Sequence, residues 1–187
     1  VGRIYGYEKI PERSPRTDVA PVRKSVRIET GERLRRLFAG ALGAHEIYCY
    51  SFVSGKDADN FDFPREKLCE LANPVAENQE YLCFSLLPAM LKTAARNLRF
   101  FREFSLFQLA NTFVKDEPSS TDLPREETGF CSIHVCREKT NSSFFTAKGA
   151  MEETLRHFKI EAYDTDYPDD TDAQNEVYPG RIITVRQ

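Results

Sequence analysis

Three side chains that could bind a metal occur close together, at Cys131, His134 and Cys136. A structural zinc site takes four such ligands in a tetrahedral arrangement. The surrounding segment is rich in β-branched and aromatic residues, so along a β-strand Cys131 would face one side while His134 and Cys136 face the other. The pattern therefore favours an ordinary hydrogen-bonded strand, and we expect no metal to be bound in this chain.

Sequence motifs for nucleotide phosphates and for nucleophilic catalysis are missing. Neither the glycine pattern of dinucleotide-binding folds nor that of phosphate-loop NTPases occurs, and there is no nucleophile elbow of the hydrolase type. His45, His134 and His157 are far apart in the sequence and have no matched nucleophile. The sequence thus predicts no catalytic residue and no cofactor-binding residue.

A basic stripe lies along one face of a predicted helix, at Lys92, Arg96, Arg99 and Arg102. Such a stripe is typical of a solvated face or of a face that pairs with carboxylates. RNA contact is the alternative, but the chain carries 26 Lys and Arg against 29 Asp and Glu, a net charge of −3. Because no global positive field attracts nucleic acid or a membrane surface, any RNA contact would have to be local, and neither DNA nor a membrane is expected as a partner.

Composition indicates one principal domain. With 187 residues, 41% of them hydrophobic, the chain can bury one sizeable core. It has no run of about 18 apolar residues, and its five cysteines are odd in number and sit mostly in apolar runs, which is typical of reduced thiols in a cytoplasmic protein. Since the chain starts at Val1 without a methionine or a signal peptide, we expect it to be cut from a longer cytoplasmic protein.

The elements that must position these residues begin after a proline-containing, charged stretch at 1–29, which we interpret as an extended arm or linker. Apolar spacing then predicts a helix from Thr30, as N-cap, to Gly43, where the helix stops. A strand is predicted over Ile47–Val53, with Tyr48 and Tyr50 on the same face. Residues 67–71 are predicted to form a weak strand that ends at a turn.

The rest of the chain favours an α+β fold. A helix over 85–102 is expected to be the longest, with Pro88 in its first turn, where proline is tolerated. Strands are predicted over 104–114 and 129–135, in antiparallel pairing, followed by a helix over 147–158, an acidic loop over 161–176 and a strand from Ile182. This order predicts an antiparallel sheet flanked by helices.

Several separated motifs, taken in order, resemble the β subunit of phenylalanyl-tRNA synthetase. They are VGRIYGYEKIP at 1–11, RLRRLFAGALGAHEIYCYSFV at 33–53, ANPVAENQEYLCFSLLPAMLKTAARNL at 72–98, FSLFQLANTF at 104–113, FFTAKGAMEETL at 144–155 and YPGR at 178–181. The chain departs from the family pattern at Cys83, Gln108, Ala110 and Tyr178, where arginine, glutamate, glycine and histidine are usual. These departures leave the apolar pattern of the family intact.

The resemblance implies a class II aminoacyl-tRNA synthetase core that has lost its catalytic motifs. Residues 1–29 would end a preceding small domain and form a linker arm, and residues 30–187 would form the core, incomplete at its C-terminus. The implied function is a non-catalytic scaffold for the catalytic α subunit in an (αβ)₂ phenylalanine–tRNA ligase. ATP and Mg²⁺ would then be bound by α, and tRNA(Phe) by the whole assembly. The alternatives are a free-standing synthetase-like paralogue that binds an amino acid or ATP, and an RNA-binding module.

The resemblance also suggests particular residues, because class II cores commonly associate through their first helix and strand. The interface candidates are Arg33, Leu34, Leu37, Phe38, Tyr48 and Tyr50, although the helix would present the same apolar face if it only covered its own sheet. The candidates for structural turns are Asn73, Pro74, Pro88, Lys148, Gly149, Pro179, Gly180 and Arg181. Lys148 and Gly149 would mark the entry into a helix, and Pro179–Arg181 a tight turn.

Overall fold

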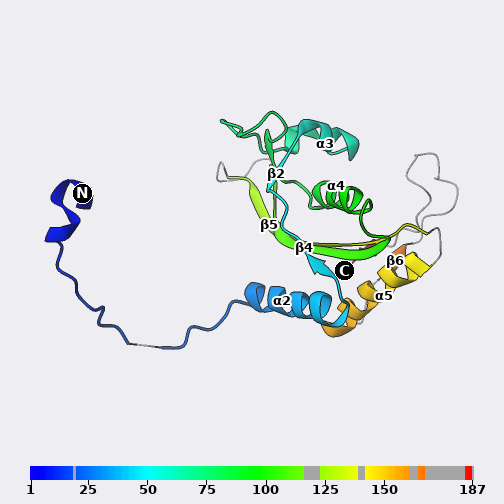
Figure 1. The fold of residues 1–187 in the computed structure, drawn as a ribbon, viewed down its shortest axis with the longest axis horizontal. Coiled ribbons are helices and arrows are strands. Elements are labelled where there is room, and N and C mark those ends of the chain that lie inside the picture. The colour runs from blue at the N-terminus through cyan, green and yellow to red at the C-terminus, as the bar shows by residue number, and fades with distance from the viewer. Residues whose placement is uncertain (19, 116–122, 139–141, 161–163, 167–183, 187) are drawn as a thin grey trace.

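The computed structural model describes residues 1–187 except 19, 116–122, 139–141, 161–163, 167–183 and 187. An N-terminal arm carries the short helix α1 (Gly2–Tyr5) and the 3-10 helix η1 (Tyr7–Lys9), then runs extended to Ser25. Figure 1 shows this arm reaching away from the body of the molecule. Residues 26–29, which the sequence assigned to the arm, already belong to the first helix of the body.

The body is built on a long antiparallel hairpin, β4 (Glu103–Val114) and β5 (Arg125–Cys136). The short strand β1 (His45–Glu46) adds to β4 in parallel, giving the order β1-β4-β5. Two smaller sheets pair β2 (Phe52–Val53) with β3 (Tyr81–Leu82), and β6 (Asp164–Asp166) with β7 (Thr184–Arg186). The predicted α+β class and the antiparallel pairing of the two long strands are confirmed.

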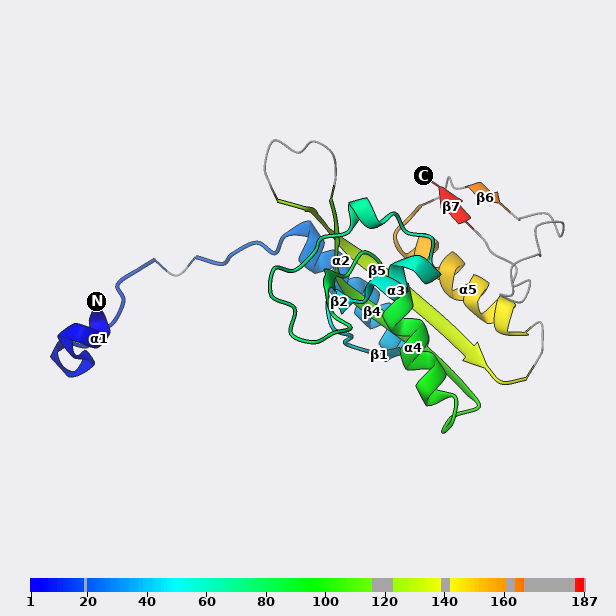
Figure 2. The same cartoon turned by 90° about the horizontal axis from the view of Figure 1, so that it is seen from above.

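Helices lie on both faces of this sheet, as Figures 1 and 2 show. One face carries α3 (Gly55–Asn60) and α4 (Leu87–Asn97), with the 3-10 helix η3 (Arg65–Lys67) nearby. The other carries α2 (Val26–Arg35), which continues into the π-helix η2 (Arg36–Ala41), together with α5 (Ser142–His157). The molecule therefore has two hydrophobic layers, one on each side of β4 and β5.

The alternation of side chains along β4 supplies both layers. Leu106 is 5% exposed and packs on the face of the sheet that α4 covers, in a cluster that includes Met90. Phe107 is fully buried on the opposite face, which α2 covers. Successive strand residues point to opposite faces, so a strand that is covered on both sides needs apolar residues at consecutive positions. This explains why the apolar alternation of the segment 104–114 looks imperfect in the sequence.

Several predicted boundaries are wrong. The first helix begins at Val26, not after Thr30, because the Ser25 hydroxyl accepts a hydrogen bond from the Ile28 amide and caps it. The helix does end before Gly43, which has the positive φ of 63° that favours glycine. Helix α5 begins at Ser142 and is longer than α4, so the expectation that α4 is the longest helix is also wrong.

The predicted strand over Ile47–Val53 is interrupted. Only Phe52 and Val53 form a strand, because the chain leaves the edge of β4 after the Ile47 amide donates to the Phe107 carbonyl. It then pairs with a different partner, β3. The weak strand predicted over 67–71 reduces to a single bridge between Glu70 and Tyr81. The last strand was predicted to begin at Ile182, which lies outside the described residues. The described residues do include the strand β7, which begins at Thr184.

Candidate functional site

The first helix packs closely on the sheet, and its apolar face is internal. Leu34, Leu37 and Phe38 are 7%, 6% and 3% exposed. The Phe38 ring lies 4.6 Å from the Phe130 ring and 5.5 Å from the Phe107 ring, measured between centroids. These three interface candidates therefore cover the sheet of their own chain, and their side chains are not presented to a partner.

Arg33 is also used within the chain. Its guanidinium donates to the backbone carbonyl of His157 at 2.7 Å and lies over the Phe158 ring, 4.5 Å from the centroid. The side chain thus joins α2 to the end of α5, and a helix C-terminus is where a cation is favoured. Arg33 fixes one helix against another.

Tyr48 and Tyr50 are the two candidates that face outward, with 79% and 78% of their surfaces exposed. They belong to the stretch 47–51 between β1 and β2, which we call the tyrosine segment. At its start, Arg35 of α2 donates to the Glu46 carboxylate at 2.7 Å. Hydrogen bonding to Glu46, and to a smaller extent to Tyr48, raises the pKa of Arg35. The Arg35–Glu46 pair therefore ties α2 to the end of β1, directly before the tyrosine segment.

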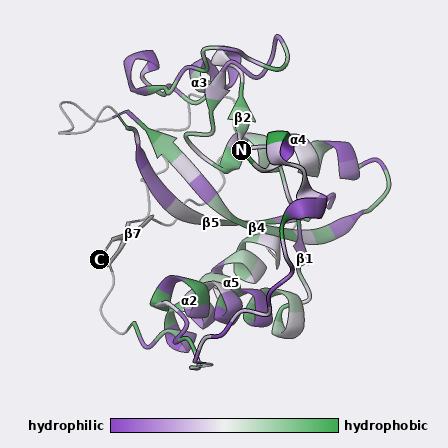
Figure 3. Cartoon of the chain, turned by 90° about the vertical axis from the view of Figure 1, so that its left-hand side faces the viewer, coloured by the Kyte–Doolittle hydropathy of each residue, from purple (hydrophilic) through white to green (hydrophobic). Residues whose placement is uncertain are grey.

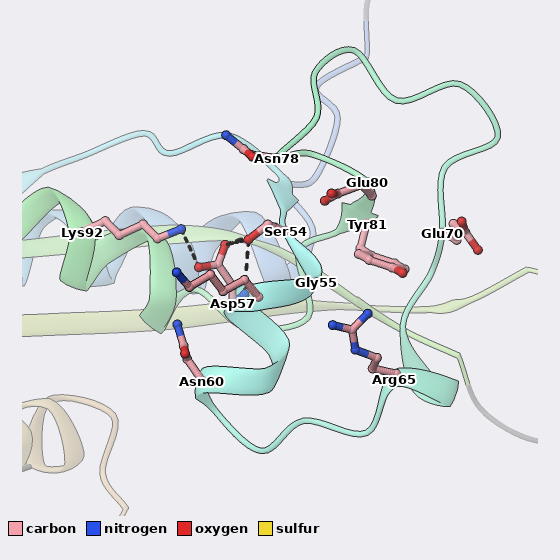
Figure 4. A pocket seen from close by; sticks show the side chains of 11 residues that line it. Ser54, Gly55, Asp57, Asn60, Arg65, Glu70, Asn78, Glu80, Tyr81 and Lys92 are labelled. Atoms are coloured by element: carbon pink, nitrogen blue, oxygen red, sulfur yellow. Dashed lines mark hydrogen bonds and ion pairs between the residues drawn. The ribbon is translucent and has the colours of Figure 1, made fainter. Parts of the chain in front are cut away.

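A second candidate is a polar hollow of about 670 Å³, shown in Figure 4. Its walls come from α3, the start of η3, the segment 70–81 and α4. The lining side chains include three cations and three acids: Lys56, Arg65, Lys92, Asp57, Glu70 and Glu80. This hollow was not predicted from the sequence.

Asp57 and Lys92 form the centre of the hollow. The Lys92 Nζ lies 2.5 Å from Asp57 Oδ1, and the Asp57 side chain is only 7% exposed. The other carboxylate oxygen accepts from the amide and the hydroxyl of Ser54, which closes a capping box at the start of α3 (Figure 4). The Ser54-x-x-Asp57 spacing is the sequence signal that could have revealed this helix.

The ionisation of Asp57 follows from these contacts. Burial alone raises the pKa of the carboxyl, but hydrogen bonds from Lys92 and Ser54 outweigh it and hold the pKa below the ordinary value of 3.8. Arg65 is likewise held by Asp59, with N–O distances of 2.8 and 2.5 Å. Carboxylates of the chain thus already neutralise two cations of the hollow, Lys92 and Arg65. One buried oxygen of the hollow, Glu80 Oε2, has no hydrogen-bond partner among the described residues.

The Cys131–Cys136 stretch forms the strand that the sequence favoured. His134 is directly opposite Ser105 in the β4–β5 ladder, and its Nδ1 lies 2.9 Å from the Ser105 hydroxyl. Its Nε2 lies 3.6 Å from the Glu103 carboxylate. Within the described ranges, no three His, Cys, Asp or Glu side chains gather closely enough to hold a metal ion, and all five cysteines are free thiols.

The turn candidates have mixed outcomes. Asn73 lies in a bend and Pro74 follows it, both exposed, and Pro88 lies in the first turn of α4 as predicted. The helix entry predicted at Lys148 and Gly149 is wrong, because α5 already begins at Ser142 and both residues are inside it. Lys148 pairs there with Glu152, one turn further along. Pro179, Gly180 and Arg181 lie outside the described residues.

The described part of the chain also contains no helix long and apolar enough to cross a membrane. Its helices are short or carry charged residues along their length.

Comparison with known proteins gives a family and a fold. The family model for the phenylalanyl-tRNA synthetase β chain CLM domain matches residues 10–186. A phenylalanine–tRNA ligase β subunit from Geobacter metallireducens is 29% identical over 173 residues, which cover 86% of this chain and 21% of the relative. The β subunit from Bacillus thuringiensis is 31% identical over 163 residues, 81% of this chain and 20% of the relative. The chain thus spans about a fifth of the length of these curated relatives.

Among solved structures, the pyrrolysyl-tRNA synthetase of Desulfitobacterium hafniense superposes with a TM-score of 0.62. The two are 11% identical, and the match covers 78% of this chain and 51% of the synthetase. At this identity the likeness shows the fold alone. That fold is the class II synthetase core that the sequence motifs predict.

Proposed function

Since the chain belongs to the phenylalanyl-tRNA synthetase β-chain CLM domain family, we propose that it is a non-catalytic, synthetase-like scaffold within the β subunit of a phenylalanine–tRNA ligase. In this proposal it holds a catalytic α subunit in an (αβ)₂ assembly that attaches phenylalanine to tRNA(Phe). ATP and Mg²⁺ are bound by α. The observation that carries the proposal is the family match over residues 10–186, on a chain that folds like a synthetase core.

The chemistry of the sheet supports the absence of catalysis by this chain. A nucleoside triphosphate carries several negative charges and is held in proteins by cationic side chains or by backbone amides at a helix N-terminus. The stretch from Phe104 to Val114, the greater part of β4, contains no charged residue, and at its centre Gln108 is 3% exposed. In the polar hollow, Lys92 and Arg65 are engaged by Asp57 and Asp59.

The tyrosine segment is the surface that fits a partner subunit. Protein interfaces are enriched in tyrosine, because its ring supplies a large contact area at low cost in conformational entropy. Tyr48 and Tyr50 lie almost fully in solvent, whereas the neighbouring Leu34, Leu37 and Phe38 are internal. We place contact with α on the tyrosine segment and the outer face of α2, where Ile28 is 54% exposed.

The test uses the complete β subunit co-expressed with its α subunit. We expect light scattering after size exclusion to give the mass of two α and two β chains. Substituting both Tyr48→Ala and Tyr50→Ala should shift this mass toward the separate subunits. Tyr7→Ala is the matched control, because Tyr7 is 69% exposed but lies in the distant arm.

A second measurement tests the catalytic part of the proposal. Phenylalanine-dependent ATP–pyrophosphate exchange should require α, and the β subunit alone should show none. Exchange by β alone would overturn the scaffold role. An unchanged mass for the double tyrosine variant would leave the scaffold role standing and remove the tyrosine segment from the interface.

A further inference from the structure

A compact surface at the end of α4 combines unpaired arginines with exposed aromatic rings. We call it the arginine–phenylalanine patch, and it consists of Arg96, Arg99, Phe100, Phe101, Arg102 and Arg137. All six residues are exposed, and Figure 3 shows the hydrophilic end of α4 running into the loop that leads to β4. The structure points to a binding surface for a single-stranded segment of RNA, and we propose this role for the patch.

The patch draws on two separate parts of the chain. Arg96 lies in the last turn of α4, and residues 98–102 follow in a turn in which the Phe100 and Phe101 amides both donate to the Asn97 carbonyl. Arg137 follows β5, and its amide donates to the Arg102 carbonyl at 2.8 Å. The hairpin therefore brings Arg137 beside Arg102, a proximity that spacing along the sequence does not reveal.

The charge of the patch is local and available. Among the described residues, none of its four arginines forms an ion pair, in contrast to Lys92, which is held by Asp57. The nearest acids in sequence are Glu103 and Glu138, and Glu103 lies 3.6 Å from His134. At physiological salt, exposed charges act over about 8 Å, so this positive surface can attract phosphates although the whole chain has a net charge of −3.

The two phenylalanines make RNA a better fit than an acidic protein surface. Phe100 is 75% exposed and Phe101 is 57% exposed, which is unusual for rings that could have been buried. The Arg99 guanidinium lies over the Phe100 ring, 5.7 Å from its centroid. A flat ring flanked by arginines is the arrangement on which unpaired bases stack while neighbouring phosphates bind the cations.

The arginine–phenylalanine patch differs from the basic stripe identified in the sequence. Lys92 is not part of the patch, because its side chain pairs with Asp57. The patch also includes Arg137, Phe100 and Phe101. This inference does not depend on the scaffold role, since the patch and the tyrosine segment share no residue. Their tests use different readouts, so either can fail without the other.

The experiment uses the complete αβ complex and a fluorescent, mixed-sequence, single-stranded RNA of about 12 nucleotides. The patch variant combines Arg96→Gln, Arg99→Gln, Arg102→Gln and Arg137→Gln. The control variant removes the same charge from the arm, with Arg3→Gln, Arg13→Gln, Arg16→Gln and Arg23→Gln. Affinity is measured by anisotropy between about 50 and 200 mM salt.

We expect the patch variant to lose at least tenfold in affinity at low salt and the control to lose much less. The slope of log affinity against log salt should fall by about 0.7 for each phosphate contact removed, or about 3 for four arginines. Phe100→Ala should weaken binding between about fivefold and a hundredfold without changing this slope, because stacking involves no counterion release.

Direct contact is checked by placing 4-thiouridine in the RNA and identifying the crosslinked peptide, which should contain Phe100. Equal losses in the patch and control variants would overturn the inference, since they would indicate a general effect of charge. Unchanged RNA affinity with loss of the αβ complex would also overturn it, and would show that the patch is a protein interface.

Discussion

Asp57 and Lys92 are 35 positions apart in the numbering, and their side chains meet at 2.5 Å in the wall of the polar hollow. The carboxylate is nearly buried, whereas the ammonium is 56% exposed. The pair therefore ties α4 to the first turn of α3, because Lys92 satisfies the buried charge of Asp57.

Lys92→Gln should loosen α3, because Asp57 would stay buried without its cation. The cost of leaving a buried polar or charged group without a partner is about 1–3 kcal/mol. Hydrogen exchange of the amides in 54–60, followed by mass spectrometry in the complete β subunit, measures this opening free energy. Lys92→Arg is the control and should keep most of the protection; equal protection in all three proteins would contradict the assigned role of the pair.

Protection of α3 should also depend on pH through Asp57. Because the pKa of the folded state is depressed, the contribution is fully present above the unfolded carboxyl pKa of about 3.9 and is lost as the pH falls through the folded value. Exchange rates corrected for their intrinsic pH dependence should therefore show α3 opening more readily in acid. Asp57→Asn should abolish this dependence, and a variant that keeps it would show that another group titrates.

Phe38→Ala should destabilise the β subunit strongly, and Tyr48→Ala should hardly change its stability. Phe38 packs against two other rings in the α2 layer, so its truncation should cost about 3–5 kcal/mol and lower the protection of η2 and β4. Tyr48 is 79% exposed, and its truncation should change stability by less than about 0.5 kcal/mol. Comparable destabilisation by the two substitutions, measured by hydrogen exchange in the β subunit without α, would show that Tyr48 packs within its own subunit.

Cys83 and Cys131 should react slowly with alkylating reagents. Burial raises the pKa of both thiols from 9.0 to about 11, so at pH 8 the reactive thiolate is about a hundredfold less abundant than in an unperturbed cysteine. Iodoacetamide followed by peptide mass spectrometry gives the rate at each site. Both sites should label rapidly in urea, and rapid labelling of either in the native protein would contradict the buried environment.

The sequence predicted the large regular elements because their signals are local. Pro88 in a first turn, Gly43 after a helix and the apolar run of β4 each depend on neighbouring residues, and all three were placed correctly. The broken strand after Ile47 was missed because it depends on a change of partner from β4 to β3. No property of the run IYCYSFV itself indicates where that change occurs.

The candidate site was predicted less well, for a similar reason. An apolar helix face looks the same whether it meets a partner or its own sheet, so Leu34, Leu37 and Phe38 could not be distinguished from true interface residues before the burial was known. The polar hollow and the arginine–phenylalanine patch each join segments that are distant in the sequence. The Ser54–Asp57 capping spacing gave a local indication of the hollow, and the basic stripe with Arg96, Arg99 and Arg102 gave one of the patch.

The position of β4 between two hydrophobic layers limits how this segment can change during evolution. Inserting or deleting one residue in the strand would turn Leu106 toward the layer of Phe107 and exchange every following side chain between the two layers. Replacement of one apolar residue by another of similar volume disturbs only its own neighbours. We therefore expect substitutions to accumulate in the middle of β4 far more readily than changes of length, which should be confined to the connections at its two ends.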